Sequence, residues 1–363
     1  MSELDSIESA VEAIRAGGMI IVVDDDDREN EGDLIMAAAT ATPEQVAFMV
    51  RHTSGILCTP LTPADAARLR LAPMVSVNDA PLQTAFTVSV DYRYGLTTGI
   101  SAEERTSTIR ALANGNAGPE DFVRPGHIFP LIARDGGVLV RSGHTEAAID
   151  LCRLAGVETV GVLAELVNDD GTVKRLPACL EFAKAHGLLI VSIADLIEYR
   201  QRRDQLVKRV ASFEVATSGG PATAIVYGTP FDPIQHVAVV FGDLGSGELV
   251  LARIHREQPL ADLLGGGTGI RQALARIGRE GRGVLLLLRE TVIGQPASDG
   301  PEGEESHASA QRRMRQWREV GIGAQILRDL GIVSIRLLAA HRRHYIGLSG
   351  FGIEIAETEI LDA

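Results

Sequence analysis

Residues 19–33 read MIIVVDDDDRENEGD. The first five, Met19 to Val23, are all apolar, and a short apolar run of this kind predicts a strand that is buried on both faces. The run stops at Asp24, so the acidic segment 24–33 begins where a buried strand ends. In α/β proteins the ends of buried strands are the usual place for ligands.

A helix is expected upstream of this strand. Apolar residues recur at helical spacing from Ile7 to Ile14. Asp5 is the expected N-cap, because Glu8 follows it three residues later, and Gly17 supplies the stop signal.

Apolar runs alternate with helical patterns further along the chain. The runs 138–140, 160–166 and 188–193 predict strands, and the segments 145–154 and 177–186 predict helices. Strands that alternate with helices through short connections are typical of an α/β arrangement.

The length of 363 residues suggests about two domains. A polar helix is expected over 194–210, and strand-like segments and the glycine-rich stretch 265–269 follow it. We place the boundary at about residue 205, which gives domains 1–205 and 206–363. The segment 294–310 mixes Pro, Gly, Ser and Glu without periodicity, which predicts a mobile loop or a disordered insertion.

Composition excludes several classes of protein. The 35 Lys and Arg against 48 Asp and Glu give a net charge of −13, which argues against nucleic acid as the main partner. No apolar run reaches the roughly 18 residues that a membrane span needs, and the N-terminus lacks a signal-peptide pattern, so we expect a cytoplasmic protein. The three cysteines, an odd number at wide spacings, indicate a reducing compartment without a disulfide framework.

The acidic segment 24–33 contains seven carboxylates and one guanidinium, Arg28. Most charge runs are solvated loops. In an extended chain, however, Glu29, Glu31 and Asp33 would share one face. Carboxylates that converge repel one another and call for a cation, and oxygen ligands favour a hard divalent ion such as Mg²⁺. Arg28 could hold an anionic group of the same substrate.

A second segment, VLVRSGHTE at 138–146, predicts a strand, a tight loop and a helix start. Free N–H groups at a helix N-terminus, together with Arg141 and the small Ser142–Gly143 pair, suit a phosphate. The motif alone is weak, because such turns are common structural units, and His144 alone is more often a capping or packing residue. The phosphate interpretation gains weight only if the acidic segment lies opposite.

Three further residues stand out. His127, between a Pro-Gly turn and an apolar patch, could shuttle protons, although a turn histidine without a catalytic role is equally consistent with the composition. Glu165 interrupts an apolar run near its end, where a carboxylate must be paired or functional. Cys58 is most simply a small buried apolar residue.

The order of these segments resembles 3,4-dihydroxy-2-butanone 4-phosphate synthase of riboflavin biosynthesis. The resemblance spans residues 5–200 and rests on seven motifs: DDDDRENEGDLIMAA (24–38), RHTSGILC (51–58), TAFTVSVD (84–91), TTGISAEERTSTIRAL (97–112), RPGHIFPL (124–131), RSGHTEAAIDLCRLAG (141–156) and AELVNDDG (164–171). It implies an α+β fold with a mixed sheet and packed helices. The implied reaction converts D-ribulose 5-phosphate to 3,4-dihydroxy-2-butanone 4-phosphate and formate, with Mg²⁺ or Mn²⁺, in a homodimer with its sites near the subunit interface.

The same resemblance assigns roles to individual residues. Glu29 and His144 are the expected metal ligands, and His127 and Glu165 the catalytic residues for proton transfer. The expected substrate-binding residues, which overlap with these, are Arg28, Glu29, Asp33, Arg141, Ser142, Gly143, His144, Thr145 and Glu165. These residue types suit the chemistry, because enolisation beside a ketone needs a base and a Lewis acid on the oxygen.

The second half resembles GTP cyclohydrolase II, through LARIHRE (251–257), EGRG (280–283), VGIGAQILRDLG (320–331) and GLSGFG (347–352). That family binds a catalytic Zn²⁺ through three cysteines. Gln258, Gly269 and Arg271 stand at the matching positions, and the chain has no cysteine after Cys179.

Without thiolates we expect no zinc in the C-terminal domain and no cyclohydrolase activity. Two alternatives stay open: a bifunctional enzyme with a rebuilt cyclohydrolase site, and a nucleotide-binding or regulatory module. Arg253, Arg282 and Arg318 could still bind phosphate, but a domain kept for packing and assembly is at least as consistent with the sequence.

Overall fold

The structure is a computed structural model of the chain. It describes residues 4–24, 28–229, 232–257, 262, 268–289, 321–339 and 352–361. The chain divides into two compact units, Met1–Arg200 and Gln201–Ala363. The segment 294–310, Gln258, Arg318 and most of the glycine-rich stretch lie outside the described residues.

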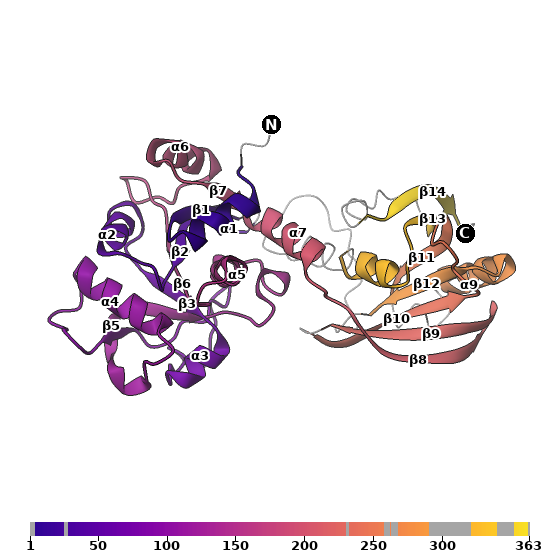
Figure 1. The fold of residues 1–363 in the computed structure, drawn as a ribbon, viewed down its shortest axis with the longest axis horizontal. Helices are drawn as coiled ribbons and strands as arrows, with labels where there is room; N and C mark the ends of the chain where they lie inside the picture. The colour runs from indigo at the N-terminus through magenta and orange to yellow at the C-terminus, as the bar shows by residue number, and fades with distance from the viewer. Residues whose placement is uncertain are drawn as a thin grey trace. The chain divides into compact units, whose positions relative to one another are not determined.

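The first unit is built on one mixed sheet with the strand order β4-β5-β3-β6-β2-β1-β7 (Figure 1). Its strands are β1 (Met19–Val23), β2 (Gly32–Ala37), β3 (Cys58–Leu61), β4 (Val90–Tyr92), β5 (Phe122–Ile132), β6 (Gly161–Glu165) and β7 (Ile190–Ser192). β1 pairs with β7 and β3 with β5 in parallel, and the other pairings are antiparallel.

Helices cover this sheet. They are α1 (Ile7–Arg15), α2 (Pro43–His52), α3 (Pro63–Arg68), α4 (Ala102–Ala113), α5 (His144–Ala155), α6 (Leu176–His186) and α7 (Ile193–Arg203). Apolar residues of α2, α4 and α6 join Ile21 and Leu34 in one buried cluster, whereas α5 packs against α1 and crosses β1, β2, β3 and β6. The strands are buried on both faces for this reason, as the run 19–23 predicted.

The N-cap of α1 is Ser6, not Asp5. The Ser6 hydroxyl accepts a hydrogen bond from the Ser9 N–H at 3.2 Å. Asp5 instead pairs with β7, because its backbone N–H donates to the Ile190 carbonyl and its carboxylate accepts from the Ile190 N–H, both at 2.8 Å. The predicted cap was therefore wrong by one residue, since Asp5 takes part in the sheet.

The apolar run 138–140 is not a strand. Its first two residues lie in a short 3₁₀ helix, η2 (Gly137–Leu139), and Val140 is the C-cap; the N-cap Gly136 and the first residue Gly137 are left-handed (φ 94° and 64°). The Val138 N–H donates to the carboxylate of Asp150 at 2.8 Å instead of joining a sheet. The Asp150 carboxylate thus takes the place of the neighbouring strand that would otherwise accept this N–H.

Strand register sets the position of the site. Val22 pairs with Asp33, and Asp33 pairs with Glu165, so these three residues form one row across β1, β2 and β6. Directly paired residues share a face of the sheet. The segment before β3 also reaches β6, because the Ser54 N–H donates to the Glu165 carbonyl at 2.9 Å beside the antiparallel bridge between Thr53 and Leu166.

The second unit has its own mixed sheet, with the order β14-β13-β11-β12-β10-β9-β8 (Figure 1). Its elements are β8 (Lys208–Thr217), β9 (Gly220–Thr229), β10 (Asp232–Phe241), β11 (Val250–Arg256), α9 (Thr268–Glu280), β12 (Gly283–Leu288), β13 (Ser334–Ala339) and β14 (Glu354–Ile360), with helical residues 321–329 before β13. β8, β9, β10 and β12 are antiparallel neighbours, and β12, β11, β13 and β14 are parallel.

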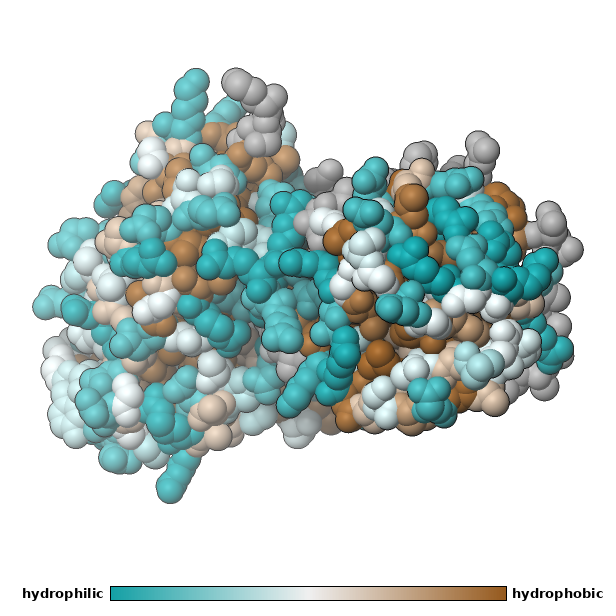
Figure 2. All heavy atoms as spheres, turned by 45° about the vertical axis from the view of Figure 1, so that its right-hand side comes forward, coloured by the Kyte–Doolittle hydropathy of each residue, from teal (hydrophilic) through white to brown (hydrophobic). Residues whose placement is uncertain are grey.

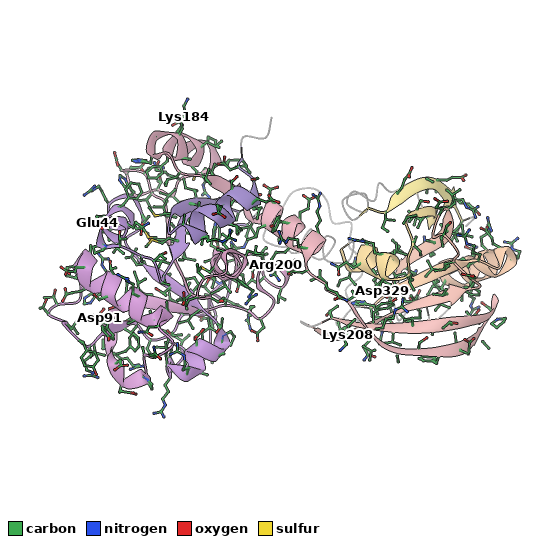
Figure 3. The ribbon with its side chains drawn as sticks, in the orientation of Figure 1. Glu44, Asp91, Lys184, Arg200, Lys208 and Asp329 are labelled. Atoms are coloured by element: carbon green, nitrogen blue, oxygen red, sulfur yellow. The ribbon has the colours of Figure 1, made fainter. Side chains whose placement is uncertain are left out.

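One carboxylate ties the antiparallel strands to the helical residues 321–329. Asp329 accepts hydrogen bonds from the Tyr227 hydroxyl and from Nε of Arg209, both at 2.6 Å (Figure 3). Burial raises the pKa of the Tyr227 phenol, and the bond to Asp329 raises it further, so Tyr227 stays a donor. This network fixes the edge of the second sheet.

Both units therefore have the α+β architecture that the resemblance implied. All three cysteines are free and buried, in agreement with the expected absence of a disulfide framework. Hydrophilic side chains cover most of the face that Figure 2 shows, with apolar ones between them. Within the described ranges, no helix is both long and apolar enough to span a membrane.

Candidate active site

Asp24 organises the acidic loop between β1 and β2. Its carboxylate, only 1% exposed, accepts from Arg28 at 2.9 Å and from the backbone N–H groups of Glu29 and Glu31 at 3.0 Å each. The Asp24 N–H donates back to the Glu31 carbonyl at 3.3 Å. A single carboxylate thus closes the loop, so Glu29 and Glu31 have defined positions although the chain there is not extended.

A second contact clamps the loop from α6. The Arg175 guanidinium, at the N-terminus of that helix, donates to the backbone carbonyls of Glu29, at 2.5 Å, and Asn30. Asn30 has a left-handed φ of 54°, which turns the chain back toward β2. The loop is therefore held at both its side-chain and its backbone groups.

His144 is the first residue of α5 and lies over the end of the β1–β2 hairpin. It is 5% exposed, and its Nε2–H donates to the Val22 carbonyl at 3.1 Å. Its Nδ1 therefore faces the acidic residues, 3.4 Å from Glu29 Oε2 and 3.9 Å from Asp33 Oδ2. A backbone acceptor on one imidazole nitrogen is the usual device for aiming the other nitrogen at a metal.

Two groups of potential ligands share this imidazole. Asp24, Glu29 and His144 form one, and Glu31, Asp33 and His144 form the other. Within each group the ligand atoms lie within 4.8 Å of one another. The acidic segment and the α5 N-terminus therefore lie together. The interpretation of residues 138–146 as a phosphate-binding segment required this.

Burial and neighbouring charges shift the pKa of each acid and of the imidazole in this cluster. Burial raises the pKa of Glu29, but the hydrogen bond from His144 and the charge of Arg28 outweigh it and hold the pKa at about 2. Burial and the Glu29 charge raise the pKa of Glu31 to about 7. Burial lowers the pKa of His144, but Asp33 and the bond to Glu29 raise it to about 9. Without a metal, the imidazolium and Arg28 are the cations that balance these acids.

Asp33 and Glu165 complete the row on β2 and β6. Asp33 is 2% exposed, and its Oδ1 has no hydrogen-bond partner in the described part of the chain. Burial raises the pKa of Asp33 well above its usual range. Glu165 accepts from the Ser54 hydroxyl at 2.6 Å. An orphaned buried oxygen beside an imidazole is costly, so it points to a bound group at this position.

The loop before α5 offers a ligand mainly backbone N–H groups rather than charged side chains. Arg141 pairs with the buried Glu146 at 2.7 Å, and a Cβ on Gly143 would come within 2.3 Å of the Arg141 guanidinium. Gly143 is the N-cap of α5 and no side chain caps this helix within the described residues. The N–H groups of the first turn, including that of the buried Thr145, and the half-buried Ser142 are left to face a ligand.

A family model for 3,4-dihydroxy-2-butanone 4-phosphate synthase matches residues 8–199, and one for GTP cyclohydrolase II matches residues 208–359. The first match covers more than half of the chain. The chain belongs to the 3,4-dihydroxy-2-butanone 4-phosphate synthase family. It is a synthase of riboflavin biosynthesis, with a GTP cyclohydrolase II domain behind the synthase domain.

Relatives share both domains. The bifunctional riboflavin biosynthesis protein RIBA 1 of Arabidopsis thaliana is 46% identical over 367 residues, which cover 96% of this chain and 68% of the relative. The crystal structure of RibBX, a two-domain synthase from A. baumannii, superposes with a TM-score of 0.82 at 37% identity and covers 99% of this chain and 100% of that one. A synthase structure in complex with two magnesium ions matches with a TM-score of 0.54 at 44% identity, covering 55% of this chain and 98% of that one.

The synthase domain does not bring all the expected residues into contact. Arg28, Glu29, Asp33 and His144 converge, and Glu165 is paired with Asp33 across β2 and β6. His127 lies on β5, and β3 separates this strand from the β6 strand of Glu165. Its imidazole contacts Asp91 at 2.7 Å instead.

Several residues of the synthase site were missed by the sequence reasoning. Asp24, Glu31, Arg175 and Asp91 were not assigned individual roles. Glu31 was part of the two-residue spacing in 29–33 that predicted convergent carboxylates. Asp24 could have been found as an acid at the end of a strand with Arg28 four residues later, a spacing that allows an ion pair. Nothing in the local sequence links Arg175 to the loop, since 145 residues separate it from Asn30.

In the cyclohydrolase domain, two of the three arginines that were expected to be able to bind phosphate contact backbone carbonyls, and Arg318 lies outside the described residues. Arg253 donates to the Leu338 carbonyl at 2.9 Å, and Arg282 donates to those of Leu244 and Glu248, at 2.6 and 3.0 Å. Gly269 and Arg271, at two of the family's zinc positions, lie in the first turn of α9.

Proposed function

We propose that the synthase domain converts D-ribulose 5-phosphate to 3,4-dihydroxy-2-butanone 4-phosphate and formate, with Mg²⁺ or Mn²⁺ held by Glu29 and His144. The observation that supports it most is the convergence of two carboxylate groups on the buried Nδ1 of His144. The donor set fits a hard ion, because it is mostly carboxylate oxygen, and Asp33 Oδ1 lacks another partner in the described part of the chain. A synthase structure with two magnesium ions supports the choice of metal.

When bound, the ion supplies Lewis-acid polarisation of the substrate's keto oxygen. The side chains of the synthase domain transfer the protons and orient the substrate. Glu165, held by Ser54, and His127 take and return protons at the sugar carbons and hydroxyls. Asp33, shielded from water, orients a substrate hydroxyl, and Arg28 balances the acidic loop beside it.

The phosphate is proposed to bind at the start of α5. Ser142, Gly143 and Thr145 offer backbone N–H and hydroxyl donors at a helix N-terminus, which favours an anion. Arg141 supports this loop through its pair with Glu146.

We also propose a homodimer. β3 separates the β5 strand of His127 from the β6 strand of Glu165, so a second copy offers the simplest way for an imidazole to reach the substrate. Ile56, two residues before β3, and Ile100, beside the Gly99 that covers His127, are 47% and 53% exposed, and an interface would bury them.

Metal affinity should rise with pH. Because the pKa of His144 is about 9 in the metal-free protein, the ion must displace a proton from Nδ1 below that pH. One displaced proton weakens binding by about tenfold per pH unit below the pKa. We expect Mn²⁺ affinity, measured by electron paramagnetic resonance of the free ion, to increase by about tenfold per unit from about pH 7 to 8.5.

The dependence should steepen below about pH 7, where Glu31 also becomes protonated. Replacement of the exposed His186 by Asn is the control and should leave the profile unchanged. A pH-independent affinity over this range would contradict the assignment of His144.

We propose that the cyclohydrolase domain is catalytically silent. No cysteine follows Cys179 in the sequence, and three thiolates are the family's zinc ligands. The contacts of Arg253 and Arg282 with backbone carbonyls favour a role in packing. A bifunctional relative makes residual cyclohydrolase activity the main alternative, and a nucleotide-binding regulatory module is the second.

One assay separates these functions. We expect the purified chain to release formate from ribulose 5-phosphate with Mg²⁺, and none above background from GTP with Zn²⁺. Stoichiometric zinc together with formate from GTP would establish the bifunctional alternative. A synthase rate that changes with added GTP, and no longer does so after truncation at residue 205, would establish the regulatory one.

A further inference from the structure

A buried carboxylate in the synthase domain contacts His127 twice. Asp91 lies in β4, beside α4 and β5 (Figure 3), and its side chain is 4% exposed. Its Oδ1 accepts the His127 backbone N–H at 2.9 Å, and its Oδ2 lies 2.7 Å from the His127 Nδ1. The backbone and the ring of His127 are thus held by the same carboxylate.

The strand pairing makes this double contact possible. Val90 pairs with Ile128 but Asp91 pairs with Val123, so residues 124–127 bulge out of β5. Gly126 lies against β4 so closely that a Cβ would come within 2.0 Å of the Val90 carbonyl carbon. The bulge therefore places His127 next to Asp91.

Gly99 covers the pair. It has a left-handed φ of 83°, and a Cβ there would lie 2.2 Å from Asp91 Oδ2 and 2.7 Å from His127 Nδ1. Glu104 holds this loop through the backbone N–H and the hydroxyl of Thr97, at 2.6 and 2.8 Å. Asp91 is thus shielded, with a side chain 4% exposed, whereas the His127 side chain as a whole is 40% exposed.

This geometry selects one tautomer of the imidazole. A carboxylate whose other oxygen already accepts a backbone N–H is an acceptor, so Nδ1 carries the proton. Nε2 then has a free lone pair on the exposed side. The charge of the buried Arg105 guanidinium interacts with that of Asp91 and favours the ionised carboxylate.

We propose that Asp91 is a positioning residue of the synthase: it fixes His127 in the Nδ1–H tautomer, so that Nε2 is the proton acceptor that faces the substrate. This inference rests on the proposed catalytic role of His127. It assigns Asp91 a function through His127 and no contact with the substrate.

The decisive variant is Asp91→Asn, which keeps the shape and replaces one acceptor by an amide donor. If the amide N–H faces Nδ1, the ring must shift its proton to Nε2 and lose its basic nitrogen. We expect kcat to fall by about 10²–10⁴, as for an aspartate-to-asparagine change behind a general-base histidine, with KM changed by less than about threefold. Asp79→Asn, at an exposed position, is the matched control and should retain the wild-type rate.

A readout that does not depend on activity is the tautomer itself. In protein labelled with [¹⁵N]histidine, with His127 assigned by comparison with His127→Gln, we expect protonated Nδ1 and unprotonated Nε2 in the wild type. The pattern should reverse in Asp91→Asn. A wild-type protein with protonated Nε2 would overturn the inference even if the variant failed to fold.

A double variant tests whether Asp91 acts through His127. In the His127→Gln background, adding Asp91→Asn should not lower kcat any further. A wild-type rate in Asp91→Asn beside an inactive His127→Gln would overturn this inference alone. A wild-type rate in His127→Gln would overturn the catalytic role of His127 in the proposed function, and this inference with it.

Discussion

Replacing His144 by alanine should lower the synthase turnover by about three orders of magnitude or more and abolish tight Mn²⁺ binding. The ring is the one group that belongs to both ligand clusters, and its Nδ1 lies 3.4 Å from Glu29. Its loss removes a ligand and leaves Glu29, Glu31 and Asp33 without the imidazolium that balances them. Steady-state formate release and Mn²⁺ titration measure the two effects.

Glu29→Gln is the companion change, because it keeps the shape of the side chain and removes its charge. We expect a comparable loss of turnover with an unchanged far-UV circular dichroism spectrum. His186→Ala, an exposed histidine on α6, is the matched control and should stay within about twofold of the wild type. Wild-type turnover in either site variant would contradict the metal assignment.

Arg200→Met should destabilise the first unit by about 3–5 kcal/mol, because it leaves a buried carboxylate without its main charge partner. Arg200, 6% exposed, donates from α7 to Asp150 and to the Gly136 carbonyl, both at 2.7 Å (Figure 3). Asp150 is fully buried on α5 and also accepts the Val138 N–H. Urea unfolding, with hydrogen exchange of α5 peptides, measures the loss.

The same carboxylate offers a matched control. Arg153 contacts Asp150 at 3.4 Å but is 51% exposed, so Arg153→Met should cost less than about 1 kcal/mol. Burial raises the pKa of Asp150 and Arg200 lowers it, so removing Arg200 raises that pKa further. The penalty in Arg200→Met should therefore shrink as the pH falls and Asp150 becomes protonated. Equal costs for the two arginine variants would contradict this account.

Most of the synthase fold could be predicted from local patterns. The apolar runs at Met19–Val23 and 160–166 are strands, and the helix from His144 ends at Gly156, as a glycine after a helical pattern predicts. The failures have tertiary causes. Residues 138 and 139 lie in η2 because the Asp150 carboxylate takes the Val138 N–H, and Ser6 caps α1 because Asp5 pairs with β7.

Motifs in the sequence could predict the candidate ligands of the site, but not the residues that hold them in place. Glu29, Asp33 and His144 were expected from motifs, and they lie together. The residues that hold them act over long sequence separations: Arg175 on Asn30, and the Val22 carbonyl on the His144 ring. Such contacts leave no periodic or local trace in a sequence, so only the fold reveals them.

The most direct test of the account is a crystal of the full chain soaked in Mn²⁺ and measured at the manganese absorption edge. We expect an anomalous peak bound to Nδ1 of His144 and to a carboxylate oxygen of Glu29, at about 2.0–2.3 Å from each. A peak that contacts neither residue, or an ion held elsewhere with the Glu29–His144 contact unchanged, would contradict it.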